Sequence, residues 1–245
     1  MCDTCGCEET TLLQKYNEER RMVELEERVL SKNDRLAEKN RGIFETMGIL
    51  VINLVSSPGA GKTTLLETTI NNLKGELNIG VIEGDQQTNR DAKRIEATGV
   101  RAHQINTMDA CHLDSHMIRD ALDTFHLDKL DLLFIENVGN LICPGAFDLG
   151  EDFRGVVLSI TEGEDKALKY PGIFLGSQIA LINKIDLLRF LEFDLDQCLS
   201  YVKGVNPSLQ CVCISAKTGE GINIWLGWLK QKIIEKKRRC KGMNV

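Results

Sequence analysis

The sequence lacks the features that would place it in a membrane, a secretory pathway or a nucleic-acid complex. No apolar stretch approaches the roughly 20 residues that are needed to span a bilayer. The N-terminus has no apolar segment that could serve as a secretory signal. The formal net charge of −6 gives no electrostatic footprint for nucleic acid. We therefore expect a cytoplasmic protein that binds neither membranes nor nucleic acid.

Histidine is scarce and cysteine is not. The chain has four histidines, with no histidine-rich stretch, and nine cysteines. An odd number of cysteines in a chain without a secretory signal indicates reduced thiols. The chain also lacks internal repeats and low-complexity blocks. Because 42% of its 245 residues are hydrophobic, it can bury one substantial core, so one main domain with an appendage is the simplest organisation.

The composition changes twice along the chain. Residues 1–41 contain three cysteines followed by a segment dense in Glu, Arg, Lys and Asn, which we interpret as a tail and a charged helix. The main domain is expected over residues 42–235, because residues 49–55 form a nearly continuous apolar run that is typical of a strand buried on both faces. Residues 236–245 are expected to be a basic tail, with Lys236-Lys237-Arg238-Arg239 as a solvated helix end.

The main domain alternates between strand-like and helix-like segments. Five further apolar runs of strand length occur at residues 79–83, 130–136, 155–160, 178–183 and 210–215. The segments between them are long enough for helices, which favours an α/β fold: a mostly parallel sheet with helices on both faces. A glycine-rich loop after the first expected strand makes a P-loop NTPase the expected fold class.

A phosphate-binding loop follows the first expected strand. Residues 56–64 read Ser-Ser-Pro-Gly-Ala-Gly-Lys-Thr-Thr and lead into a helical stretch. Glycines let backbone N–H groups converge on phosphate oxygens, Lys62 supplies positive charge to the β- and γ-phosphates, and the Thr63 hydroxyl can ligate Mg²⁺. Ser56 replaces the first glycine of the usual G-x-x-x-x-G-K-S/T pattern, and a small residue preserves the turn. The expected nucleotide-contacting residues of this loop are Gly59, Ala60, Gly61, Lys62, Thr63 and Thr64.

Carboxylates follow two other strands. Glu136-Asn137-Val138-Gly139 ends one strand, where Glu136 can hold Mg²⁺ directly or through water and the Gly139 amide can sense a γ-phosphate. Asp85 follows another strand and is expected to be a metal-linked switch residue, although an ordinary strand-end turn remains an alternative. Asp131 lies at the opposite end of its strand and is interpreted as structural. The residues expected to carry hydrolysis are Lys62, Thr63, Asp85 and Glu136.

A guanine-reading motif comes later in the chain. Asn183-Lys184-Ile185-Asp186 follows a strand, and the Asp186 carboxylate can accept hydrogen bonds from guanine N1 and the exocyclic amine. Adenine offers no matching pair of donors, so GTP is favoured over ATP. The segment Ser215-Ala216-Lys217 follows another strand and can place a backbone amide at guanine O6. The order of these elements along the chain makes GTP and GDP the expected nucleotides.

Three cysteines near the N-terminus offer a metal site. Cys2, Cys5 and Cys7 lie around Gly6, which permits a tight wrap, and a backbone amine is nearby. Thiolates with nitrogen suit Ni²⁺ in planar geometry or Zn²⁺ in tetrahedral geometry. A redox pair or idle tail cysteines are the alternatives.

A second metal site is predicted inside the main domain. Cys111 and His112 are adjacent, and Cys143 follows the Glu136-to-Gly139 motif by only a few residues. Our hypothesis is that these three residues bind a metal ion with a geometry that follows the nucleotide state, with His116 peripheral. The alternative is a Cys-His pair satisfied within the core. The remaining thiols are interpreted as packing or bystander residues: Cys198, Cys211, Cys213 and Cys240.

Together these motifs resemble the HypB family of hydrogenase nickel-incorporation GTPases over nearly the whole chain. The resemblance implies GTP-dependent homodimerisation, a tight N-terminal nickel site and a weaker nickel or zinc site at the dimer interface. It also implies delivery of nickel to the NiFe-hydrogenase large subunit with a partner metallochaperone of the HypA type. The lack of a histidine-rich stretch argues against nickel storage. Related urease-accessory GTPases share the class but are not expected to carry the Cys2, Cys5 and Cys7 arrangement.

Two other functions stay open at this point: a passive metal buffer with vestigial nucleotide binding, and a P-loop ATPase with another cargo. Asn140 follows Gly139 where fast GTPases place a water-orienting Gln, so intrinsic hydrolysis is expected to be slow.

Overall fold

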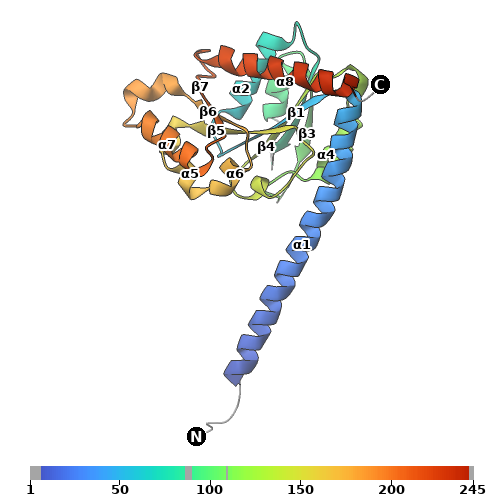
Figure 1. Cartoon of the computed structure of the whole chain (residues 1–245), viewed down its shortest axis with the longest axis vertical. Coiled ribbons are helices and arrows are strands. Elements are labelled where there is room, and N and C mark those ends of the chain that lie inside the picture. Colours follow the sequence, from blue (N-terminus) through green and yellow to red (C-terminus); the bar gives the residue numbers. More distant parts are fainter. Residues whose placement is uncertain (1–6, 86–89, 109, 243–245) are drawn as a thin grey trace.

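The centre of the molecule is a seven-stranded sheet whose strand pairs are all parallel (Figure 1). This computed structural model describes residues 7–85, 90–108 and 110–242. The order across the sheet is β3-β2-β4-β1-β5-β6-β7. The strands are β1 (Leu50–Ser56), β2 (Ile79–Asp85), β3 (Arg101–Asn106), β4 (Leu132–Gly139), β5 (Phe153–Ser159), β6 (Ile179–Asn183) and β7 (Gln210–Cys213). The expected α/β fold with a mostly parallel sheet is confirmed, and six of these strands match the six apolar runs.

Helices cover both faces of this sheet. The α-helices are α1 (Cys7–Met47), α2 (Lys62–Leu73), α3 (Arg90–Glu96), α4 (Ser115–Leu122), α5 (Lys166–Lys169), α6 (Pro171–Leu175), α7 (Leu195–Val205) and α8 (Ile222–Gly242). The 3-10 turns are η1 (Leu127–Lys129), η2 (Cys143–Gly145), η3 (Ile160–Glu162) and η4 (Ile185–Phe190). Buried residues of α2, α3 and α8 share one core cluster, whereas those of α4 to α7 belong to clusters on the opposite face.

The continuous apolar run of β1 reflects this double cover. Leu50, Ile52 and Leu54 pack into the cluster that contains α2 and α8, while Val51 packs into the cluster with α4. Because successive side chains of a strand point to opposite faces, a strand covered on both faces must be apolar throughout. β1 is also the central strand of the sheet, so the loop that follows it lies at the middle of the sheet edge.

β3 was not predicted from the sequence. It pairs only with β2, at the edge of the sheet, and its residues are exposed or half-buried. Arg-Ala-His-Gln-Ile-Asn contains no apolar run, because an edge strand with partial cover does not need one.

α1 projects away from the domain, with its C-terminal part packed beside α4 (Figure 1). Asn33 and Asn40 are buried and both bond to the backbone of Ser115, at 2.9 and 2.8 Å. Contacts with the domain therefore begin before residue 42, the boundary expected from composition. Cys2 and Cys5 lie outside the described residues, and so does the side chain of Cys7, so the N-terminal metal site stays a prediction.

The basic run near the C-terminus differs from expectation. It belongs to α8, but Lys236 is only 1% exposed, and its ammonium lies 2.9 Å from Glu45 Oε1 and 2.8 Å from Asp152 Oδ1. A buried charge needs such partners, so this lysine ties α8 to α1 instead of facing solvent. Lys237 pairs with Asp131, which also accepts a bond from the Asn78 amide, as suits a structural carboxylate. Among the helices of the described residues, none is long and apolar enough to cross a bilayer.

Candidate functional site

A cavity of about 530 Å³ opens at the carboxyl edge of the sheet. Its walls are the loop after β1, the ends of β2 and β4, part of α3 and the Lys184 side chain. Carboxyl ends of parallel strands are the usual ligand position in open α/β sheets. The phosphate loop, Asp85, Glu136 and Gly139, which were all singled out from the sequence, meet here.

Gly61 allows the backbone conformation of the loop after β1, and Ser56 orients the Lys62 side chain. Gly61 has φ +98°, and a Cβ there would lie 2.6 Å from the Asn183 amide nitrogen, so only glycine fits. The Lys62 ammonium donates to Ser56 Oγ at 2.8 Å. Ser56 therefore does more than preserve a turn, since it orients the lysine. Burial lowers the pKa of Lys62, against the opposing charge of Glu136.

Thr63 and Glu136 are already in contact. The Thr63 hydroxyl donates to Glu136 Oε1 at 2.8 Å, while Glu136 Oε2 is buried without a hydrogen-bond partner. Burial raises the pKa of Glu136. A hydroxyl beside an unsatisfied buried carboxylate is a set of hard oxygen donors that fits Mg²⁺.

Glu83 also lines the cavity, although Asp85 was chosen from the acidic segment Glu83-Gly84-Asp85 when the sequence was analysed. It lies opposite Glu136 across the β2–β4 pair, is 2% exposed, and has its own Oε2 buried without a hydrogen-bond partner. Burial and the neighbouring Glu136 carboxylate raise the pKa of Glu83 to about 8. Period-two alternation puts Glu83 on the same face of β2 as Asp85, and that signal could have found it.

α3 adds a charged group that had no sequence signal. The Arg94 guanidinium makes a bidentate ion pair with Glu67. Its Nε donates to Glu67 Oε1 at 3.1 Å and its Nη2 donates to Glu67 Oε2 at 2.6 Å. Nη2 also donates to the Thr64 hydroxyl at 3.1 Å, and Asp91 contacts Nη1. The end of the phosphate loop is thereby fastened to α3, the helix that follows β2.

The base-reading residues form one connected arrangement. The Asn183 amide donates to Ala60 O at 2.9 Å, and its Oδ1 accepts from the Ala216 amide at 3.0 Å. Lys184, in the left-handed region with φ 66°, donates to Gly59 O at 2.7 Å. Asn183 thus joins the phosphate loop to the segment after β7.

Asp186, the residue predicted to read guanine, is fixed by a neighbouring serine. The Ser215 hydroxyl donates to Asp186 Oδ1 at 2.6 Å, and the Thr218 amide donates to Ser215 Oγ at 3.1 Å. This leaves Asp186 Oδ2 for donors of a base. Lys217 is exposed and Ala216 is buried.

The end of β4 packs against the phosphate loop, and the residue after it contacts the backbone of Cys111. A Cβ at Gly139 would lie 3.0 Å from Pro58 Cα, so glycine is required for this approach. Asn140, the next residue, donates from its amide to Cys111 O at 3.2 Å. A segment that touches the phosphate loop therefore also touches the Cys111 backbone.

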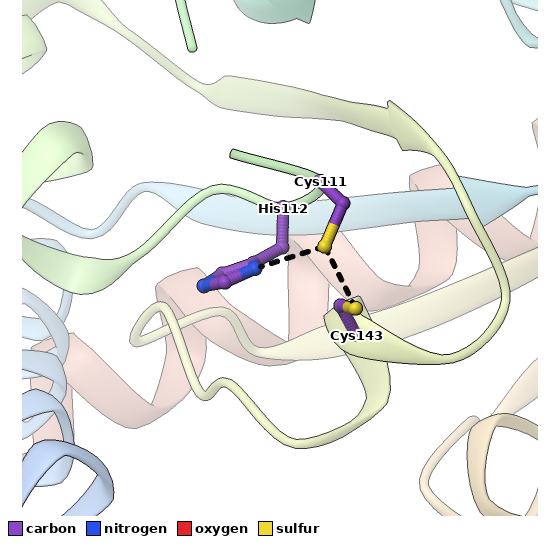
Figure 2. Close-up of side chains that lie close together, drawn as sticks. All are labelled: Cys111, His112 and Cys143. Carbon is purple, nitrogen blue, oxygen red and sulfur yellow. Dashed lines mark hydrogen bonds between the residues drawn. The ribbon is translucent and has the colours of Figure 1, made fainter. Parts of the chain in front are cut away.

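Cys111, His112 and Cys143 come together as the sequence analysis predicted. Their ligand atoms all lie within 4.8 Å of one another. The Cys111 thiol donates to Cys143 Sγ at 2.7 Å, and His112 Nδ1 lies 3.7 Å from Cys111 Sγ. Both contacts are drawn as dashed lines in Figure 2. His116 is not part of this cluster, since its side chain is 64% exposed and contacts Asp120.

The protonation of the cluster is set by its surroundings. The bond to Cys143 and burial raise the pKa of the Cys111 thiol. Burial lowers the pKa of His112, and a neutral imidazole is the form that binds metals. The His112 ring stacks on Phe147 with centroids 3.8 Å apart, which fixes its plane. Two thiols and an imidazole are soft donors suited to Ni²⁺ or Zn²⁺.

The remaining thiols fit packing roles. Cys198 is fully buried and Cys211 and Cys213 are half-buried in the same apolar cluster, where burial raises the pKa of each thiol. Cys240 lies within α8 instead of a tail and donates to Glu45 O at 3.0 Å.

The chain matches known proteins over most of its length. The family "CobW/HypB/UreG, nucleotide-binding domain" matches residues 50–213. The chain is 55% identical over 212 residues to the hydrogenase maturation factor HypB of Escherichia coli, covering 86% of this chain and 73% of that protein.

Two solved structures share both fold and sequence with the chain. The crystal structure of HypB from Helicobacter pylori in complex with nickel is 40% identical, with a TM-score of 0.79, and the match covers 84% of this chain and 97% of that one. The structure of HypB from Archaeoglobus fulgidus is 40% identical with a TM-score of 0.78, over 83% and 99% of the two chains. The chain therefore belongs to the HypB family of hydrogenase maturation factors, within the CobW/HypB/UreG group of P-loop GTPases.

Proposed function

We propose that this protein is a GTP-hydrolysing nickel metallochaperone that binds Ni²⁺ and Zn²⁺ and delivers nickel during NiFe-hydrogenase maturation. Its hold on the metal is coupled to the nucleotide state and to dimerisation. The observation that carries the proposal is the position of the Cys111, His112 and Cys143 cluster, because Asn140 joins the Cys111 backbone to the strand end that lies against the phosphate loop.

The hydrolytic chemistry rests on positioning and charge. Lys62, oriented by Ser56, stabilises the charge that develops on the transferring phosphoryl group, and Asp186 selects guanine. Thr63, Glu136 and Asp85 would hold Mg²⁺, which when bound neutralises charge on the phosphates. Water is the acceptor. The Asn140 amide is engaged with Cys111 O, which supports the expectation that intrinsic turnover is slow.

Dimerisation is proposed to bury the face around the metal cluster. Met108 precedes Cys111 by three residues and is 74% exposed, and Ile142 precedes Cys143 and is 69% exposed. Exposed large apolar side chains on both arms of the cluster support a protein contact there. In the GTP-bound state we propose a homodimer through this face. The further partners would be a HypA-type metallochaperone and the hydrogenase large subunit.

Metal titration tests the proposal. Ni²⁺ and Zn²⁺ would be titrated into protein whose Cys2, Cys5 and Cys7 are replaced by serine, so that only the inner cluster is read. With a non-hydrolysable GTP analogue in place of GDP, we expect the nickel dissociation constant to change by about tenfold, as is typical of coupled sites. Equal constants in the two states would favour a passive metal buffer. Equal affinity for ATP and GTP would favour an ATPase.

A further inference from the structure

We infer that four polar side chains position the two segments of the proposed metal cluster relative to the nucleotide site: Asn53, Asn137, Glu151 and Arg154. We call these four side chains the polar relay. The first arm of the cluster is the segment with Cys111 and His112, and the second arm is the segment with Cys143. The inference rests on the proposed coupling and names the residues that transmit it. All four side chains are at most 9% exposed, and they connect to one another through hydrogen bonds within the core.

Asn137 holds the first arm of the cluster. It follows Glu136, the partner of Thr63, and its Oδ1 accepts from the Leu113 amide at 3.2 Å. Leu113 follows His112 directly and is fully buried. A shift of the β4 end therefore moves the hydrogen-bond acceptor to which the Cys111–His112 segment is attached.

Arg154, paired with Glu151, bonds to the backbone of the second arm, the segment that carries Cys143. Arg154 donates to Gly145 O at 3.1 Å and to Phe147 O at 2.9 Å, and its Nη2 lies 2.9 Å from Glu151 Oε1. Gly145 is two residues beyond Cys143, and Phe147 carries the ring on which His112 stacks. The guanidinium thus fixes the segment that bears both Cys143 and the support for the imidazole.

Asn53 joins the two ends. It lies on β1, three residues before Ser56, and is 0% exposed. Its Oδ1 accepts from the Asn137 amide at 3.3 Å, and its own amide donates to Glu151 Oε1 at 3.0 Å. The strand that presents the phosphate loop therefore carries the central member of the relay.

Burial makes the hydrogen bonds of the relay costly to break. A polar group inside the protein has no water to exchange with, so losing one hydrogen bond costs its full desolvation, and a neighbour must follow to keep the bond. A movement of β1 or β4 on nucleotide exchange is thus transmitted to both arms together. Substitutions along such a network are expected to change the coupling between sites without contact to either ligand.

The test compares Asn53→Ala with Asn206→Ala in the full chain that has serine at positions 2, 5 and 7. Asn206 is the control, since it is also a buried asparagine whose amide donates hydrogen bonds within the core, in its case to the backbone carbonyls of Phe174 and Ser177. None of the three cluster residues lies in that region. The quantity measured is the ratio of nickel dissociation constants with GDP and with the GTP analogue. We expect Asn53→Ala to bring this ratio at least about fivefold closer to one. GDP affinity should stay within about threefold, and Asn206→Ala should keep the parent ratio.

The outcomes separate the relay from the proposed function. A parent ratio of one would overturn the coupling itself and the relay with it. A parent ratio far from one that Asn53→Ala preserves, or that Asn206→Ala reduces equally, would overturn the relay alone.

Hydrogen exchange in the unsubstituted protein supplies a test that does not depend on a variant's folding. The Leu113 amide bonds to Asn137 and the Leu149 amide bonds to Glu151, so both report the relay, whereas the Ser208 amide bonds to Asn206 and serves as control. We expect exchange at Leu113 and Leu149 to change together on replacing GDP by the analogue, with Ser208 unchanged. Unchanged rates at Leu113 and Leu149 would overturn the inference.

Discussion

The nucleotide cavity and the metal cluster lie at the same edge of the sheet, but they are held in different ways. In the cavity, Lys62, Glu83 and Glu136 are nearly fully buried and are presented by strands and the first turn of a helix. In the cluster, Cys111, His112 and Cys143 are half-buried and come from loops after β3 and β4. This contrast fits the proposed function, in which chemistry on phosphate would require fixed charges and a site that releases nickel would have to change shape.

Lys62→Ala should have the largest effect and should act on the cavity alone. Removing one preorganised group that stabilises transition-state charge costs about 10²–10³ in rate, so phosphate release at saturating GTP should fall by at least that factor. Nickel affinity with GDP bound should stay unchanged, because Lys62 does not contact the cluster. A parallel loss of nickel affinity in the GDP state would show that the two sites are not separable.

Cys143→Ser should act on the cluster alone. Loss of a supporting residue around a metal typically costs 10- to 100-fold in affinity, so loss of a ligand should weaken nickel binding at the inner cluster by about a hundredfold or more. Titration with a competing chelator measures this. Cys213→Ser is the control, since Cys213 is half-buried in a different cluster, and it should leave nickel affinity intact. Retained affinity in Cys143→Ser would remove Cys143 from the ligand set.

Asp186→Ala tests how the cavity selects its base. The carboxylate is held by Ser215 at 2.6 Å and is the expected partner of two guanine donors. Its loss should weaken GDP binding by about a hundredfold, as expected when two hydrogen bonds to a charged carboxylate are lost. ATP binding should not change. Equal loss for both nucleotides would point to a structural role for the Asp186–Ser215 bond.

Glu83 should affect the pH dependence of stability in the protein free of Mg²⁺ and nucleotide. The pKa of Glu83 is raised to about 8 from 4.5, so between these values the folded state retains a proton that the unfolded chain has released. This group's stabilisation is full below about pH 4.5, declines as pH rises and is lost above about pH 8. Glu83→Gln should therefore reduce the decline in unfolding free energy between about pH 5.5 and pH 8.5, measured by denaturant titration in EDTA. An identical decline in both proteins would mean that the Glu83 carboxyl is not the source.

Local motifs allowed much of the fold and the cavity to be predicted from sequence. A glycine loop after a strand, and apolar runs buried on both faces, depend on neighbouring residues only, so Lys62 and Thr63 could be placed before the structure was known. β3 could not be predicted, because an edge strand with partial cover has no continuous apolar signal.

Other features depend on residues far apart in the chain. Lys236 looked like a solvated charge because Glu45 and Asp152, its partners, are distant in sequence. The polar relay joins residues from Asn53 to Arg154 through hydrogen bonds that no spacing rule encodes. The grouping of Cys143 with Cys111 and His112 was predicted because Cys143 follows the Glu136-to-Gly139 motif by only a few residues.

The projection of α1 separates the predicted N-terminal metal site from the metal site proposed at Cys111, His112 and Cys143. Cys7 begins α1, and Asn33, which bonds to Ser115 near His112, comes 26 residues later. At 1.5 Å per residue this stretch of helix is about 40 Å long, so Cys7 and the cluster of one molecule cannot share an ion while the helix is intact. Transfer between them then requires an encounter with a second molecule or release into solution. Transfer by encounter should speed up with protein concentration and slow as the sample is diluted, whereas transfer that begins with release would have a rate set by dissociation and independent of concentration.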